Sequence, residues 1–137
     1  MGSFPTVFAQ AVSDTLQAVA RVQFIEHKGS RVLFINYADC DIAMLKAVTE
    51  EMHRVISREL SHSVLTLNDV TGTSFDSESV ALLKSKVAAN APYVKRAAVI
   101  GITGLQRLIY EAVQRFSQRS IPLFDSREEA LDWLIKD

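Results

Sequence analysis

The apolar positions near the start of the chain follow the two patterns expected of neighbouring strands. Residues 22–26 alternate apolar and polar side chains, which is typical of a half-buried strand. Residues 31–37 are almost continuously apolar, which is typical of a strand covered on both faces. The four residues between them include Gly29, which can take the positive φ that tight turns require. The pattern predicts an antiparallel hairpin.

Further along the chain, short apolar runs alternate with stripes of helical period. Strands that alternate with helices form parallel neighbours joined by right-handed crossovers. The chain is therefore predicted to be an α/β protein, with a mixed, mostly parallel sheet of about five strands, an N-terminal antiparallel hairpin and four or five helices. Pro122 predicts that the last strand lies at an edge of the sheet. The predicted later strands are 64–67, 95–100 and 121–124, and the helices are 42–60, 77–90, 105–116 and 126–134.

Residues 1–20 are predicted to form an N-terminal arm, and residues 21–137 a single domain. Phe8, Val12, Leu16 and Val19 recur at about four-residue spacing, which favours an amphipathic helix in the arm. Two interpretations stay open: the arm packs loosely on the body of the protein, or it reaches a second subunit.

Composition narrows the class of protein. A net charge of −1 argues against a general nucleic-acid binder. The single cysteine, Cys40, excludes an internal disulfide framework and suits a reducing compartment. No apolar run approaches the roughly 20 residues that span a bilayer. The sequence therefore predicts a cytoplasmic protein with no transmembrane segment.

Two similar turns, Asp69-Val70-Thr71-Gly72 and Gly101-Ile102-Thr103-Gly104, each follow a predicted strand and precede a helix. Parallel strands place such turns at one edge of the sheet, where α/β proteins bind ligands. Glycines and helix N-termini there can bind a small phosphate or carboxylate. Alternatively the glycines only make turns and the hydroxyls cap helices, which the missing Walker lysine favours. The candidate residues are Asp69, Thr71, Gly72, Ser74, Asp76, Ser77, Glu78, Ser79, Gly101, Thr103 and Gly104.

No motif for catalysis or metal binding is present in the sequence. The histidines His27, His53 and His62 lack HExxH spacing, and Cys40 has no CxxC partner. No GxSxG nucleophile elbow exists. We therefore expect no cofactor, no metal and no enzymatic activity.

Several runs considered together resemble one known family. They are 27–29 with 32–35, 69–72, 92–95, 101–105, Arg115-Phe116, and 124–125 with 129–134. As a set, over about residues 20 to 136, they resemble small bacterial SpoIIAA-like proteins of the STAS superfamily. The resemblance implies a β/α superhelix with a mixed sheet. It also implies three kinds of relative. The first are anti-sigma-factor antagonists, which bind a partner kinase and are switched by serine phosphorylation. The others are cytoplasmic modules of anion transporters and proteins whose folds are likened to those of lipid-binding proteins.

The phosphorylation motif of the antagonists is roughly Asp-Ser-Ser-Gly, and its counterpart here is Asp76-Ser77-Glu78-Ser79. Glu78 replaces the second serine and Ser79 replaces the glycine. Ser77 and Ser79 remain candidate phosphoacceptors, because a phosphate is favoured at a helix N-terminus. Alternatively Glu78 supplies the negative charge expected in a first helical turn.

Two functions follow from these observations. The first is a non-enzymatic regulatory or protein-interaction module of the STAS type, a homodimer that recognises a protein partner through the loop edge from Asp69 to Ser79. The alternative is a carrier of a lipid or another small, apolar anion, which requires a cavity of about 300 Å³ or more.

Overall fold

The computed structural model of the chain describes residues 4–73, 76–104, 107, 111, 115 and 121–136, and only the backbone of residues 4–8 and 11. The predicted helix over 105–116 and the candidate Ser74 lie outside the described residues. The elements are α1 Phe4–Arg21, β1 Val22–His27, β2 Ser30–Asn36, α2 Ile42–Ile56, β3 Val64–Asp69, α3 Ser77–Asn90, the 3₁₀ turn Ala91–Tyr93, β4 Val94–Ile100, β5 Leu123–Phe124 and α5 Arg127–Leu134.

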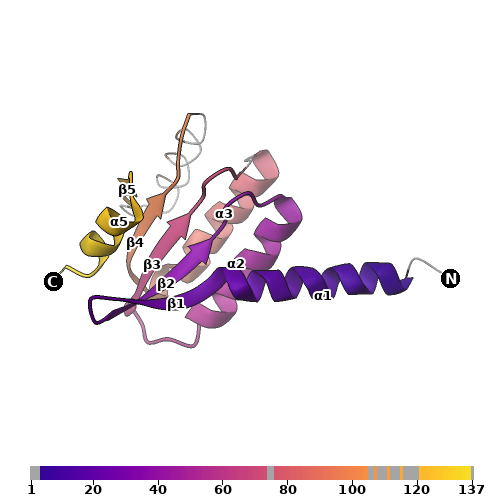
Figure 1. The fold of residues 1–137 in the computed structure, drawn as a ribbon, viewed down its shortest axis with the longest axis horizontal. Helices are drawn as coiled ribbons and strands as arrows, with labels where there is room; N and C mark the ends of the chain where they lie inside the picture. The colour runs from indigo at the N-terminus through magenta and orange to yellow at the C-terminus, as the bar shows by residue number, and fades with distance from the viewer. Residues whose placement is uncertain are drawn as a thin grey trace.

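The sheet has five strands in the order β1-β2-β3-β4-β5 (Figure 1). The pair β1 and β2 is antiparallel, and every later pair is parallel. The α/β fold, the hairpin and the mixed sheet are thereby confirmed. The short strand β5 lies at the edge, as Pro122 predicted.

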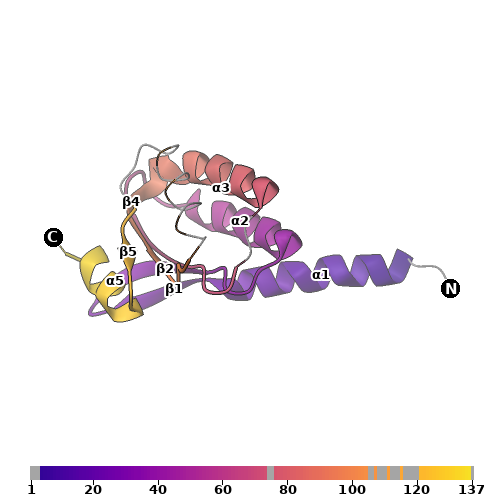
Figure 2. The same cartoon turned by 90° about the horizontal axis from the view of Figure 1, so that it is seen from above.

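Helices cover both faces of the sheet (Figure 2). On one face, Leu45 and Val48 of α2 pack with Leu33 and Ile35 of β2 in the larger apolar core. On the other face, Leu131 and Leu134 of α5 pack on Leu67 of β3 in a smaller core. A strand such as β2 is buried from both sides, which explains its continuous apolar run.

Helix α1 extends well beyond the body of the protein (Figure 1). Its C-terminal end is anchored, because Ala18 is only 1% exposed and Arg21 bonds to the loop after β2. The described side chains of the predicted apolar stripe are exposed. Val12, Leu16 and Val19 are 45%, 66% and 38% exposed, respectively. The small residue Ala18 and the hydrogen-bonded Arg21 face inward instead.

Among the described residues, no helix combines the length and the apolar character that crossing a membrane requires.

Candidate binding site at the carboxyl edge of the sheet

The carboxyl ends of the three central strands are aligned. Asn36 pairs with Asp69 in the register of β2 and β3, and Asp69 pairs with Ile100 in that of β3 and β4. Backbone bonds continue the alignment past the strands: Tyr37 N donates to Asp69 O at 2.8 Å and Val70 N to Ile100 O at 3.0 Å. The loops after β2, β3 and β4 therefore leave the sheet side by side.

The two similar turns contact each other. Gly101 has φ +88°, and a Cβ there would lie 2.7 Å from Thr71 N and 3.0 Å from Asp69 Oδ1. Asp69 Oδ1 accepts hydrogen bonds from Thr71 N and Thr71 Oγ1, at 3.0 and 2.7 Å. The carboxylate of Asp69 thus stabilises the turn to which it belongs, and the missing side chain of Gly101 allows that turn to approach closely. Gly104 has φ +55°, and no atom of the described residues lies within 4 Å of where its Cβ would be, so it acts as a turn residue.

A surface cavity of about 420 Å³ lies next to these turns, between the loops after β2 and β3. Gly72 has φ +68°, and a Cβ there would overlap the carboxylate of Asp39, whose Cγ would be 3.2 Å away. Glycine at position 72 thus permits the close approach of the two loops. The residues that line the cavity are Asp39, Cys40, Asp41, Ile42, Gly72, Asp76 and Ser79.

Two of the three aspartates at the cavity cap helices. Asp41 Oδ1 accepts from Met44 N at 2.8 Å at the start of α2. Asp76 Oδ1 accepts from Ser79 N at 2.8 Å at the start of α3, while Ser79 Oγ accepts from Asp76 N at 2.7 Å. The bond from the Ser79 amide lowers the pKa of Asp76. The Asp76 carboxylate is therefore anionic at neutral pH. Both aspartates sit at helix N-termini, where the helix dipole favours negative charge.

Asp39 differs from the other two aspartates. Its carboxylate is exposed, and among the described residues it forms no hydrogen bond or ion pair. Its backbone has φ +58°, and Asp39 N donates to Thr71 O at 2.9 Å, which ties this loop to the first turn. A positive φ is uncommon outside glycine and is best tolerated by Asn and Asp. This carboxylate is therefore available to an external group.

Cys40 closes the inner side of the cavity. Its thiol is buried, and Arg21 Nη1 lies 3.3 Å from Sγ and donates to Ala38 O at 2.8 Å. Burial raises the pKa of the Cys40 thiol, and the neighbouring Asp41 and Asp39 add to the rise, although Arg21 opposes it. A protonated thiol is a poor nucleophile, so Cys40 acts here as a packing group held by Arg21.

The charge at the cavity favours a cationic group over an anion. The helix N-termini that would attract an anion are already occupied by Asp41 and Asp76. Lys46 pairs with Glu78 at 3.3 Å between two exposed side chains, which removes a nearby positive charge. A phosphate or carboxylate entering the cavity would meet three carboxylates that form no ion pair among the described residues.

The two candidate phosphoacceptors have different surroundings. Ser77 is exposed in the first turn of α3. Ser79 is 2% exposed, and its hydroxyl also donates to Asp76 O at 3.0 Å. A kinase would reach Ser77 directly, whereas Ser79 becomes accessible only if the first turn opens.

The structure brings some of the sequence-predicted residues to the cavity and leaves others beside it. The residues that line the cavity are Gly72, Asp76 and Ser79. The adjacent pair of turns contains Asp69, Thr71 and Gly101. The first turn of α3 contains Ser77 and Glu78, which do not line the cavity. Thr103 and Gly104 are exposed farther along the second turn.

Sequence reasoning missed the loop after β2 as part of the site. Asp39, Cys40, Asp41 and Ile42 supply more than half of the lining. The signal was present, because β2 is also a parallel neighbour of β3 and its carboxyl end must lie at the same edge.

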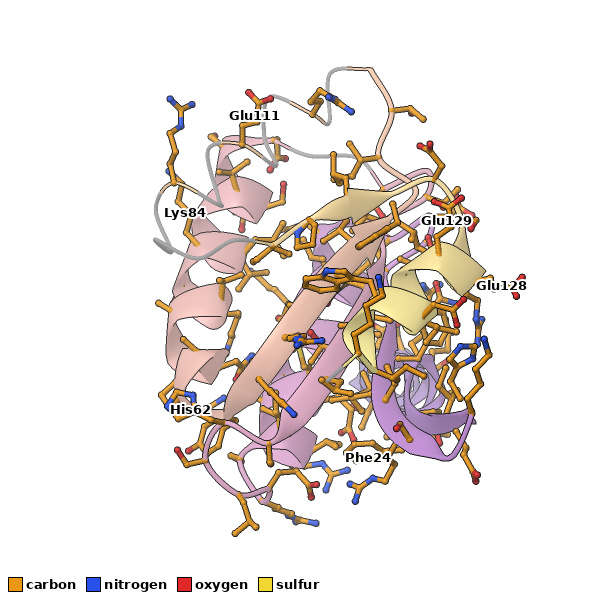
Figure 3. The ribbon with its side chains drawn as sticks, turned by 90° about the vertical axis from the view of Figure 1, so that its left-hand side faces the viewer. Phe24, His62, Lys84, Glu111, Glu128 and Glu129 are labelled. Carbon is orange, nitrogen blue, oxygen red and sulfur yellow. The ribbon has the colours of Figure 1, made fainter. Side chains whose placement is uncertain are left out.

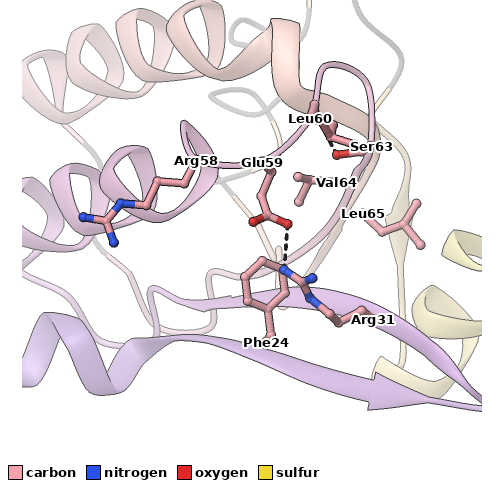
Figure 4. A pocket seen from close by; sticks show the side chains of 8 residues that line it. All are labelled: Phe24, Arg31, Arg58, Glu59, Leu60, Ser63, Val64 and Leu65. Atoms are coloured by element: carbon pink, nitrogen blue, oxygen red, sulfur yellow. Dashed lines mark hydrogen bonds and ion pairs between the residues drawn. The ribbon is translucent and has the colours of Figure 1, made fainter.

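A second cavity, of about 320 Å³, lies at the opposite end of the sheet (Figure 4). Phe24, Val64 and Leu65 form its apolar wall, and Leu60, which is 81% exposed, stands at its rim. Arg31 lies over the Phe24 ring at 3.7 Å and pairs with Glu59 at 2.7 Å. Arg58 also lines the cavity, and Figure 4 shows its guanidinium pointing away from this pair.

Within the part of the chain that the structure describes, no group of three His, Cys, Asp or Glu side chains is placed to hold a metal ion. Comparison of the chain with family models, with curated proteins and with solved structures found no match. The resemblance to SpoIIAA-like proteins therefore rests on the sequence motifs alone.

Proposed function

We propose that this protein is a non-enzymatic interaction module whose carboxyl-edge cavity recognises a positively charged segment of a protein partner. The observation that carries the proposal is the convergence of Asp39, Asp41 and Asp76, from two loops, on one surface cavity. Two of these carboxylates are fixed by backbone N–H groups, so a partner does not have to order them. Such preorganisation reduces the entropic cost of binding.

The decisive experiment removes the negative charge of the three aspartates and keeps the size of their side chains. In a triple variant, Asp39→Asn, Asp41→Asn and Asp76→Asn, each asparagine retains an oxygen that can cap a helix and tolerates the positive φ of position 39. Alanine at position 76 would not serve, because it would also remove the cap of α3. The control carries Glu26→Gln, Glu50→Gln and Glu128→Gln, three exposed acids outside the cavity lining. Glu128 points outward from α5 (Figure 3).

Binding is measured to an array of short peptides that vary in lysine and arginine content. We expect the wild type and the control to bind the basic peptides, with affinity that falls as salt rises. The triple variant should lose this binding while its melting temperature stays close to that of the wild type. Equal binding by the triple variant and the wild type would contradict the proposal.

A carrier of a small amphiphile is the second candidate, and the cavity at the opposite end of the sheet favours it. Its volume of about 320 Å³ reaches the lower range of ligand pockets, and its wall is apolar. Native mass spectrometry of freshly purified protein tests this function. A carrier would show a bound mass that Leu60→Asp removes, whereas bare protein in every preparation would count against it.

A further inference from the structure

Helix α1 presents an apolar stripe that nothing in the described part of the chain covers. Val12, Leu16 and Val19 recur four and three residues apart, so they lie on one face of the helix. Leu16 is 66% exposed in their middle. The helix projects past the body in both views (Figures 1 and 2). Large apolar side chains grouped on a projecting helix are typical of an interaction surface.

The charges on α1 indicate which kind of partner fits. Only two of its 18 residues are charged, Asp14 and Arg21. Arg21 is engaged with the loop after β2, and Asp14 accepts a hydrogen bond from Gln10 at 2.9 Å. An interfacial membrane helix normally carries lysines and arginines on its polar face, and α1 has none available. A nearly uncharged face also has no like charges to repel an identical helix.

The spacing of the stripe suits a second copy of the same helix. Leu16 has Val12 four residues before it and Val19 three residues after it. In an antiparallel pair related by a two-fold axis near Leu16, the Val12 end of each helix meets the Val19 end of the other. This is the self-complementarity that an isologous interface requires.

We infer that the protein dimerises through α1, with Leu16 at the centre of an antiparallel helix pair. The inference concerns a different surface from the carboxyl-edge cavity and does not depend on the proposed function. Eighteen residues at about 1.5 Å each give a helix roughly 27 Å long and 10 Å wide. A contact of that size is smaller than the standard interface of about 800 Å² per partner. The dimer is therefore weak and dissociates on dilution.

Sedimentation equilibrium over about 5 to 500 µM protein tests the inference with a matched pair of variants. Leu16→Glu places a charge at the centre of the stripe, and Gln17→Glu places the same charge one residue away, outside the stripe. We expect the wild type and Gln17→Glu to share a dimer dissociation constant within about threefold, and Leu16→Glu to weaken the dimer at least tenfold. Because both side chains are exposed, both variants should fold, and circular dichroism checks this.

A second measurement reports the position of the interface. Under mild oxidation, Leu16→Cys should form a disulfide-linked dimer faster than Gln17→Cys, while the buried Cys40 stays unreactive. A monomeric wild type at all concentrations would overturn the inference. A dimer of Leu16→Glu that is as strong as that of the wild type would also overturn it. So would binding to phosphatidylcholine–phosphatidylglycerol vesicles by the wild type and Gln17→Glu but not by Leu16→Glu.

Discussion

The contact between the two similar turns gives a sharp prediction, because the second turn contains its own control. Gly101 and Gly104 both have positive φ, so alanine at either position costs roughly 1–2 kcal/mol of backbone strain. At Gly101 the new Cβ would also lie 2.7 Å from Thr71 N. A backbone atom cannot rotate away, and forced overpacking costs roughly 1–3 kcal/mol more. At Gly104 no atom of the described residues is within 4 Å of the new Cβ.

We therefore expect Gly101→Ala to lower the free energy of unfolding by about 3 kcal/mol, and Gly104→Ala by about 1 kcal/mol. For a chain of 137 residues, these losses correspond to falls in melting temperature of about 12 °C and about 4 °C. Urea unfolding followed by circular dichroism gives the free energies, and calorimetry gives the melting temperatures.

A double variant identifies the contact. Thr71→Ala removes the hydroxyl that a Cβ on Gly101 would overlap, but it leaves the backbone nitrogen in place. The pair Gly101→Ala and Thr71→Ala should therefore recover only part of the lost stability. If Gly101→Ala and Gly104→Ala destabilise the protein equally, within about 0.5 kcal/mol, then the turns do not pack as described and the reasoning fails.

Three other measurements test the packing and the caps. Asp76→Ala should lower the melting temperature by a few degrees and Asp76→Asn should not, because only alanine removes the cap of α3; equal losses would refute the cap. Since folding lowers the pKa of Asp76 below its ordinary value of 3.8, the stabilisation that its charge provides should be complete above that pH and disappear as pH falls through the folded pKa. Melting curves from pH 7 to pH 2.5 should therefore show the wild type losing part of its advantage over Asp76→Ala only in acid. Leu67→Ala, at a fully buried position, should lower the free energy of unfolding by about 3 kcal/mol, as measured by urea unfolding. Leu60→Ala, at an exposed position, should change it by no more than about 0.5 kcal/mol. A large effect at Leu60 would contradict its exposed position.

The order of strands and helices along the chain was predictable from the sequence because its signals are local. Alternation over 22–26 and a continuous apolar run over 31–37 reflect burial on one face or on both. The turn residues between them lead directly to the hairpin. The carboxyl edge then follows from parallel pairing alone, and three of the candidate residues at that edge, Gly72, Asp76 and Ser79, line the cavity.

The parts that could not be predicted depend on long-range contacts. Asp39 and Asp41 have a sufficient local explanation as residues at a helix start, so the one signal that places them at the cavity is the parallel pairing of β2 with β3. The loop is held in place by Arg21, which lies 19 residues before Cys40. No periodicity in the sequence indicates a contact between Arg21 and Cys40.

Helix α1 shows the limit of periodicity. The spacing of Val12, Leu16 and Val19 predicts an apolar face, but the same spacing suits a face that meets the body and one that meets another molecule. The inward face here uses Ala18 and Arg21. A sequence pattern of apolar residues does not identify this face, because it consists of a small residue and a hydrogen-bonded cation.

The most direct test of the central claim, that the carboxyl-edge cavity recognises a cationic segment, is an amide ¹H–¹⁵N correlation titration with a hexa-arginine peptide. The account predicts that the largest shifts fall on Cys40, Gly72 and Ser79, which line the cavity. These shifts should vanish in the triple asparagine variant and persist in the triple glutamine control. Unchanged cavity amides, or equal shifts in the asparagine variant, would contradict it.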